Sequence, residues 1–199
     1  MRLPDHDHET VPGYPPAQRR LLLDIARRSV ERAVRLGAPL AVDVEALPEP
    51  LRAVRASFVT LTREGRLRGC IGTLEGHRPL AQDVAGNAFD TALNDPRFNP
   101  VTGVELDLVR IELSILSPME PLEVTSERQL LAGIRPFVDG LVIDDGIRRA
   151  TFLPKVWESL PEPQAFVRAL KRKAGMPDEY WPAQMRTYRY HSETFSEAE

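Results

Sequence analysis

The segment LVRIELSIL, residues 108–116, limits the possible folds of this chain more than any other part of the sequence. Its side chains alternate between two faces: Val109, Ile111, Leu113 and Ile115 fall on one, and Arg110, Glu112, Ser114 and Leu116 on the other. A period of two is that of a β-strand with one buried face. The segment is therefore predicted to be a strand, and it is the clearest one in the chain.

Two further pairs of segments have the pattern of β-hairpins. Residues 57–61 and 66–74 flank Arg63-Glu64-Gly65, and residues 140–143 and 148–153 flank Asp144-Asp145-Gly146. Helical periodicity is found in three segments, residues 17–36, 79–92 and 163–174. Helices and antiparallel hairpins are mixed without a repeating strand–helix–strand order. This favours an α+β fold with antiparallel sheets and packed helices.

Length and composition indicate one globular unit. The chain has 199 residues, of which 42% are hydrophobic and 28% charged, ordinary values for a folded protein. Residues 1–15 are proline-rich and lack an apolar period, so we expect a flexible leader there. Residues 16–195 are expected to form a single domain of two lobes.

The charge balance argues against several kinds of partner. Lys and Arg total 26 and Asp and Glu total 29, a formal net charge of −3, so nucleic acid binding is not expected. No apolar run approaches the roughly 20 residues that span a bilayer, and no signal-peptide core follows the N-terminus. We expect a cytoplasmic protein that does not bind membranes.

Cys70 is the only cysteine, which excludes an internal disulfide and a zinc site with several thiolate ligands. No HExxH spacing is present, and we predict no metal site. Walker and GxGxxG motifs are also absent, so the sequence identifies no cofactor.

Cys70 lies in LRGCIGT, residues 67–73. Strand alternation would place Arg68, Cys70 and Gly72 on one face. A guanidinium beside a thiol stabilises the thiolate, so Cys70 is a candidate nucleophile with Arg68 as its electrostatic partner. The alternative is a small, buried side chain in a strand. Gly69 and Gly72 indicate a bulge, or a point where a ligand or another strand approaches the backbone closely.

Three other residues have two interpretations each. Arg97, just past a helix end, is suited to bind an anionic group of a ligand or to pair with Asp95 and close the turn. Glu112 and Ser114 lie on the polar side of their strand, where they either face a ligand or are simply solvated.

Several motifs together resemble one known family. LRGCIGT, Asp95-Pro96-Arg97-Phe98, IELSILSP at 111–118, ATFLP at 150–154 and Lys173-Ala174-Gly175 occur in the order found in the AMMECR domain family. Its bacterial and archaeal members are called AmmeMemoRadiSam system protein A. The resemblance covers about residues 17–195 and implies two lobes around a cleft. The positions shared with the family are Arg68, Gly69, Cys70, Gly72, Thr73, Arg97, Phe98, Ser114, Thr151, Pro154 and Lys173.

Two functions follow as hypotheses. In the first, the protein is an enzyme or ligand-binding protein for a small molecule. Cys70 and Arg68 would be the catalytic pair, and the expected ligand contacts are Gly69, Gly72, Thr73, Arg97, Glu112 and Ser114. In the second, it is a non-catalytic adaptor for MEMO-like and radical SAM proteins, as the family name implies. The reaction stays open in both.

Overall fold

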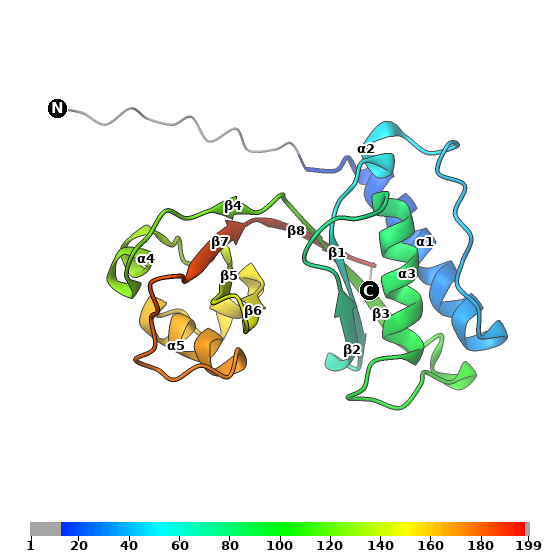
Figure 1. Cartoon of the computed structure of the whole chain (residues 1–199). Coiled ribbons are helices and arrows are strands. Elements are labelled where there is room, and N and C mark those ends of the chain that lie inside the picture. The colour runs from blue at the N-terminus through cyan, green and yellow to red at the C-terminus, as the bar shows by residue number, and fades with distance from the viewer. Residues whose placement is uncertain (1–12, 198–199) are drawn as a thin grey trace.

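The computed structural model describes residues 13–197, which form two lobes side by side (Figure 1). The first lobe contains α1 (Pro16–Leu36), α2 (Glu49–Arg52), β1 (Ser57–Arg63), β2 (Arg66–Gly72), α3 (Leu80–Leu93), the 3₁₀ turn η1 (Gly103–Glu105), β3 (Val109–Leu116) and β8 (Ser192–Ser196). The second contains β4 (Glu120–Pro121), α4 (Glu127–Gly133), β5 (Gly140–Asp144), β6 (Arg149–Phe152), the 3₁₀ turn η2 (Pro154–Glu158), α5 (Pro163–Lys173) and β7 (Arg186–Tyr190).

The first lobe is a four-stranded antiparallel sheet covered on one face by helices. The strand order is β2-β1-β3-β8, and α1 and α3 lie on the same side of the sheet (Figure 1). The alternating side chains of β3 enter this core: Ile111 and Leu113 are fully buried, and Ile115 is nearly so. The strand predicted at residues 108–116 and the first hairpin are confirmed.

The second lobe is built in the same way around a smaller core. Its sheet has the antiparallel order β4-β7-β5-β6, and helices α4 and α5 supply buried side chains to its core. Trp157 of η2 stacks on Phe166 of α5 with ring centroids 3.7 Å apart, and both rings are fully buried. The predicted α+β fold with antiparallel sheets is confirmed.

A small apolar cluster joins the lobes. Ala56 and Leu116 come from the first lobe, and Val142 and Tyr190 from the second, all of them buried. Because residues of both lobes are buried against one another, the relative position of the two sheets is determined by packing and not only by the chain connections.

Residues 1–12, most of the predicted leader, lie outside the described residues. The end of that predicted segment contacts the first lobe: the backbone N–H of Tyr14 donates to the Glu193 carboxylate at 2.9 Å. Within residues 13–197, no helix has the length and apolar character required to cross a membrane.

Candidate functional site

A β-bulge decides which way Cys70 points. In the β1–β2 hairpin Thr62 pairs with Leu67 and Leu61 with Gly69, which leaves Arg68 as an extra residue. Without this extra residue, regular one-to-one pairing from the hairpin turn would place Cys70 opposite Val59. Val59 is fully buried on the helix-covered face of the sheet. With the bulge, Cys70 pairs with Thr60 instead. Directly paired residues share a face, so Cys70 lies on the face turned away from the helices.

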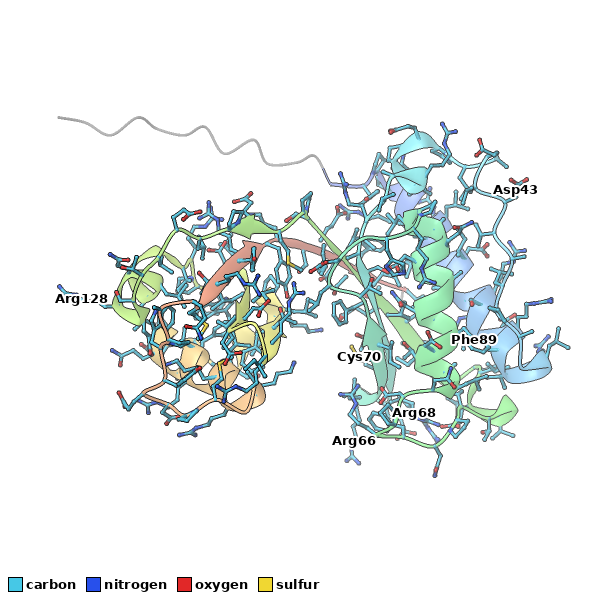
Figure 2. All side chains as sticks on the ribbon, viewed as in Figure 1. Asp43, Arg66, Arg68, Cys70, Phe89 and Arg128 are labelled. Carbon is cyan, nitrogen blue, oxygen red and sulfur yellow. The ribbon has the colours of Figure 1, made fainter. Side chains whose placement is uncertain are left out.

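That face carries a row of polar side chains across three strands. Thr60 of β1 pairs with Cys70 of β2 on one side and with Glu112 of β3 on the other. The Thr60 hydroxyl donates to the Cys70 sulfur at 3.3 Å. Figure 2 shows Cys70 on the side of the first lobe that looks toward the second. Cys70 is half-buried, and its sulfur belongs to a free thiol.

Asp95 and Arg97 hold the backbone of Cys70 on the open edge of the sheet. The Asp95 carboxylate accepts from the Cys70 N–H at 2.8 Å, and Arg97 donates to the Cys70 carbonyl at 2.9 Å. The two side chains also pair with each other at 2.8 Å. Hydrogen bonds from Arg97 and from the Cys70 N–H keep the pKa of Asp95 well below its usual range, against the opposing effect of burial.

Arg97 thus adopts the turn-closing contact that was one of its two predicted roles. Its Nε and Nη2 atoms are used by Asp95 and Cys70, and the side chain is still 53% exposed. The Asp95 carboxylate raises the pKa of Arg97, and a negatively charged Cys70 raises it further. The guanidinium therefore lies against the Cys70 backbone as well as next to Asp95.

Lys173, at the end of α5, brings a second cation to Cys70 from the other lobe. Its ammonium donates to the Thr151 carbonyl at 3.0 Å and lies 5.2 Å from the centre of the Phe152 ring. Although the side chain is exposed, desolvation by neighbouring atoms lowers the pKa of Lys173; a Cys70 thiolate opposes this effect, and the charge of Arg97 adds to it. Among residues 13–197 the hydrogen-bond partner of Lys173 is the Thr151 carbonyl, and no carboxylate pairs with it.

Glu112 and Ser114, the two predicted residues of β3, make different contacts. Lys155 of η2 donates to Glu112 at 2.8 and 2.9 Å, an ion pair between the lobes. Ser114 is buried and shares a 3.0 Å hydrogen bond with the hydroxyl of Thr194 on β8. Glu112 therefore faces the second lobe, while Ser114 bonds within its own sheet.

The expected contact between Arg68 and the thiol does not occur, because the bulge at Arg68 interrupts the alternation that predicted it. Arg68 Nε donates to Glu105 at 2.9 Å, and none of its contacts involves the Cys70 side chain. The Arg68 hydrogen bonds lower the pKa of Glu105 to about 2, in spite of burial. The cations near the sulfur are Arg97 and Lys173.

The close approaches predicted at the two glycines are made by protein atoms. A Cβ on Gly69 would lie 2.9 Å from the Thr91 carbonyl oxygen of α3, and one on Gly72 would lie 2.3 Å from the Phe58 ring. The Thr73 hydroxyl donates to Asp83, a fully buried carboxylate, at 3.0 Å. These contacts give all three residues a structural role, and their predicted contact with a ligand stays a prediction.

A pocket of about 470 Å³ lies between the lobes, but it does not contain Cys70. Arg55, Glu75, Asp144, Arg149, Arg186 and Tyr188 are among its lining residues. The cross-strand pair of Phe58 and Gly72 lies between this pocket and the pair of Thr60 and Cys70. We place the candidate site at Cys70, because the pocket does not contain the thiol and most of its charges are paired with each other. No cluster of three metal-ligating side chains occurs within residues 13–197.

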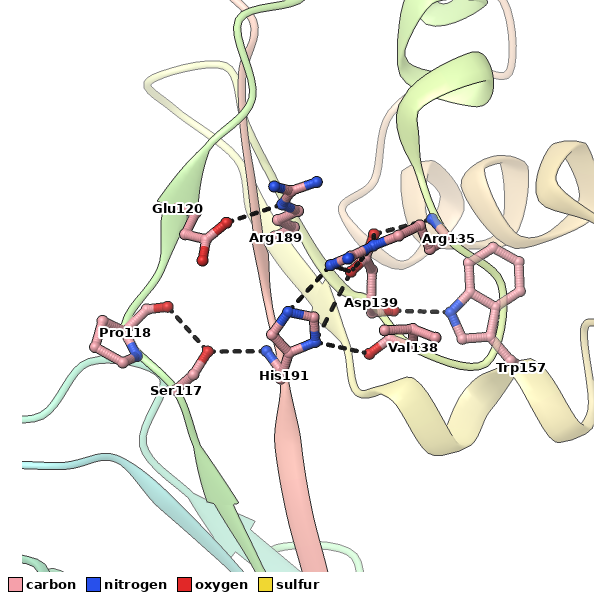
Figure 3. A network of polar contacts seen from close by, with 9 residues as sticks. All are labelled: Ser117, Pro118, Glu120, Arg135, Val138, Asp139, Trp157, Arg189 and His191. Atoms are coloured by element: carbon pink, nitrogen blue, oxygen red, sulfur yellow. Dashed lines mark hydrogen bonds and ion pairs between the residues drawn. The ribbon is translucent and has the colours of Figure 1, made fainter. Parts of the chain in front are cut away.

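The connection between the lobes is tied to the second lobe through His191 (Figure 3). Ser117 and His191 lie in the two segments that connect the lobes, one between β3 and β4 and the other between β7 and β8. The His191 N–H donates to the Ser117 hydroxyl at 2.9 Å. Arg135 donates to the His191 ring at 3.1 Å, and the other ring nitrogen lies 3.3 Å from the Val138 carbonyl. This network joins the connection between the lobes to residues 135–138 of the second lobe.

A sequence model of the AMMECR1 family matches residues 23–195. The chain belongs to the AMMECR1 family. The resemblance seen in the sequence is thereby confirmed.

Archaeal and bacterial relatives match over most of the AMMECR1 domain. A protein of Methanothermobacter thermautotrophicus is 38% identical over 193 residues, which is 92% of this chain and 98% of the relative. One from Thermotoga maritima is 38% identical over 85% of this chain and 94% of its own length. The crystal structure of the uncharacterized protein PH0010 from Pyrococcus horikoshii superimposes with a TM-score of 0.82 at 30% identity, covering 89% of this chain and 90% of that one.

Several contacts of this AMMECR1 site were not predicted from the sequence. Thr60 and Asp95 contact Cys70, and Lys173 and Lys155 approach the same face from the second lobe. The alternation of β1 could have indicated Thr60, since it falls between the buried Val59 and Leu61. No local pattern links Lys173 to Cys70, because their electrostatic interaction depends on how the two lobes pack together.

Proposed function

We propose that this AMMECR1 protein binds a small molecule between its lobes and uses the Cys70 thiol as a nucleophile or direct contact. The observation that carries this proposal is a half-buried free thiol that accepts a hydrogen bond from the Thr60 hydroxyl and has the Arg97 guanidinium bound to its own carbonyl group, with Lys173 of the second lobe interacting electrostatically with it. A purely structural cysteine in a sheet needs none of these groups. Thiolates are the reactive form of cysteine, and nearby positive charge favours them.

Each residue would have a defined part. Thr60 donates its hydroxyl proton to the sulfur, which stabilises a thiolate by hydrogen bonding. Asp95 and Arg97 hold the Cys70 backbone and so orient the side chain. Within the described part of the chain, Lys173 donates only one hydrogen bond, to the Thr151 carbonyl, and its ammonium is suited to donate to a bound molecule.

Glu112 and Lys155 would close the opposite side of the site. Their ion pair joins β3 to η2 next to Thr60, so a ligand that contacts Cys70 has this bridge as its neighbour. The pair is partly exposed, with the Lys155 side chain 57% accessible, and such pairs contribute little to stability. It can therefore open and re-form as a ligand enters and leaves.

Protection of the thiol tests this proposal. A panel of metabolites is screened for compounds that raise the melting temperature of the wild-type protein. Each active compound is then tested for its effect on the rate at which iodoacetamide modifies Cys70, measured by intact-protein mass spectrometry. We expect at least one compound that slows alkylation and binds the Cys70→Ser variant more weakly. If every compound that binds leaves the alkylation rate unchanged, or none binds, the proposal is wrong.

A further inference from the structure

We infer that the molecule which reaches Cys70 is an anion, held by Arg97 from the first lobe and Lys173 from the second. This inference rests on the proposed function and adds the substrate class: a small molecule with a carboxylate or phosphate group next to the atom that meets the sulfur. Its basis is the charge and the unused hydrogen-bond donors of these two residues.

The charges around Cys70 balance except for one. Asp95 neutralises Arg97, and Glu112 neutralises Lys155. Lys173 has only the Thr151 carbonyl as a hydrogen-bond partner within residues 13–197. A thiolate at Cys70 would balance this ammonium. Once the sulfur forms a covalent bond and loses its charge, Lys173 is left for an anionic group of the substrate.

Both cations also retain free donors. Nη1 of Arg97 has no hydrogen-bond partner in the part of the chain that the structure describes, since Asp95 and Cys70 take Nε and Nη2. Lys173 uses one of its three N–H groups. An oxyanion placed between the lobes would therefore accept hydrogen bonds from each.

Aromatic rings position the two cations without neutralising them. Arg97 lies 5.6 Å from the centre of the Phe98 ring, and Lys173 lies 5.2 Å from that of Phe152. A ring face attracts a cation but carries no net charge. The positive charge of Lys173 thus stays available to a ligand.

Two alkylating agents that differ in charge test the inference. The Cys70 thiolate attacks the methylene carbon of iodoacetate or iodoacetamide, the S–C bond forms, the C–I bond breaks and iodide leaves. The ratio of the two rate constants is divided by the same ratio for glutathione, which removes the intrinsic difference between the reagents. We expect this normalised ratio to favour anionic iodoacetate by about tenfold at low ionic strength, and to fall when salt is added.

Variants assign the preference to Lys173. We expect Lys173→Met to bring the normalised ratio to about one, and Lys173→Arg to preserve it. Arg172→Gln is the matched control, because Arg172 is the adjacent residue of α5 and pairs with Asp178; its ratio should equal that of the wild type. Lys173 is exposed, so its replacement does not threaten folding.

The outcomes separate this inference from the proposed function. If both reagents modify folded wild-type protein with a normalised ratio near one, the substrate class is wrong while the reactive thiol stands. A high ratio that persists in Lys173→Met contradicts the role of Lys173. If neither reagent modifies the folded protein, the proposed function itself fails.

Discussion

Asp95 is the residue on which the position of Cys70 depends most. Its carboxylate is almost fully buried and accepts four hydrogen bonds, from the Cys70 N–H and from three groups of Arg97. From the sequence, Arg97 could bind either a ligand or Asp95, because its guanidinium suits both partners. Only the fold shows that Asp95 also reaches the edge strand, 25 residues earlier in the chain.

Replacing Asp95 should therefore destabilise the protein. Asp95→Asn retains the size of the side chain but removes the charge, and we expect the free energy of unfolding to fall by about 2 kcal/mol, the value of hydrogen bonds to a charged group. Urea denaturation at pH 7 measures this change. Asp107→Asn, at an exposed position, is the control and should change stability by less than about 0.5 kcal/mol. A similar result for both variants would contradict the role assigned to Asp95.

Glu105 makes a pH-dependent contribution to stability through Arg68. Its pKa is about 2 in the folded protein against an ordinary value of 4.5, so the folded state binds the proton more weakly than the unfolded chain. This contribution is fully present above pH 4.5 and is lost as the pH falls toward 2.

The variant Glu105→Gln should thus differ most from the wild type at neutral pH, and the difference in unfolding free energy should shrink between pH 4.5 and pH 2. Urea denaturation at a series of pH values provides the measurement. Glu75→Gln, at an exposed residue, should show no such convergence. A constant difference between wild type and Glu105→Gln across this range would refute the explanation.

At the scale of elements, alternation and turn residues in the sequence correctly predict the strands and hairpins, but not the register of the first hairpin. The extra residue at Arg68 reverses which face Cys70 occupies, and a bulge depends on contacts across the pair and with α3. Gly69 and Gly72 were the one signal of this bulge in the sequence. The same signal did not reveal that Phe58 and Thr91 would fill the space beside them.

The strand β2 should not tolerate a side chain at Gly72. A Cβ there would lie 2.3 Å from the Phe58 ring and 2.5 Å from the Ser57 carbonyl oxygen, so Gly72→Ala must push the strands apart. We expect a loss of about 1–3 kcal/mol in unfolding free energy. Gly103→Ala, where no atom lies within 4 Å of the new Cβ, is the matched control. Equal stability of the two variants would show that the sheet yields at this point.

At the scale of the whole molecule, the candidate site exists only while the two lobes are packed together. The sequence indicates the α+β class and the family motifs, but the position of the second lobe against the first results from long-range packing around Tyr190. The adaptor hypothesis and its MEMO-like and radical SAM partners stay predictions, because docking depends on the surface of the partner as well as on that of this chain.

The apolar junction should make the lobes unfold together. Both tryptophans, Trp157 and Trp181, belong to the second lobe, so their fluorescence reports on that lobe alone. Amide hydrogen exchange of α3, pulsed at each urea concentration and read by mass spectrometry, reports on the first. We expect the two probes to give the same urea midpoint in the wild type, and different midpoints in Tyr190→Ala, which empties the junction. Tyr180→Ala, within the second lobe, should lower stability without separating the probes.

The most direct test of the central claim, that the Cys70 thiol is open to small molecules in the folded protein, is its alkylation rate measured against urea below the unfolding transition. We predict a rate that is independent of urea, because the reagent reaches the sulfur between the packed lobes. A logarithm of the rate that rises linearly with urea, at the slope of global unfolding, would mean that Cys70 reacts only from the unfolded chain. That result would contradict a ligand site at Cys70.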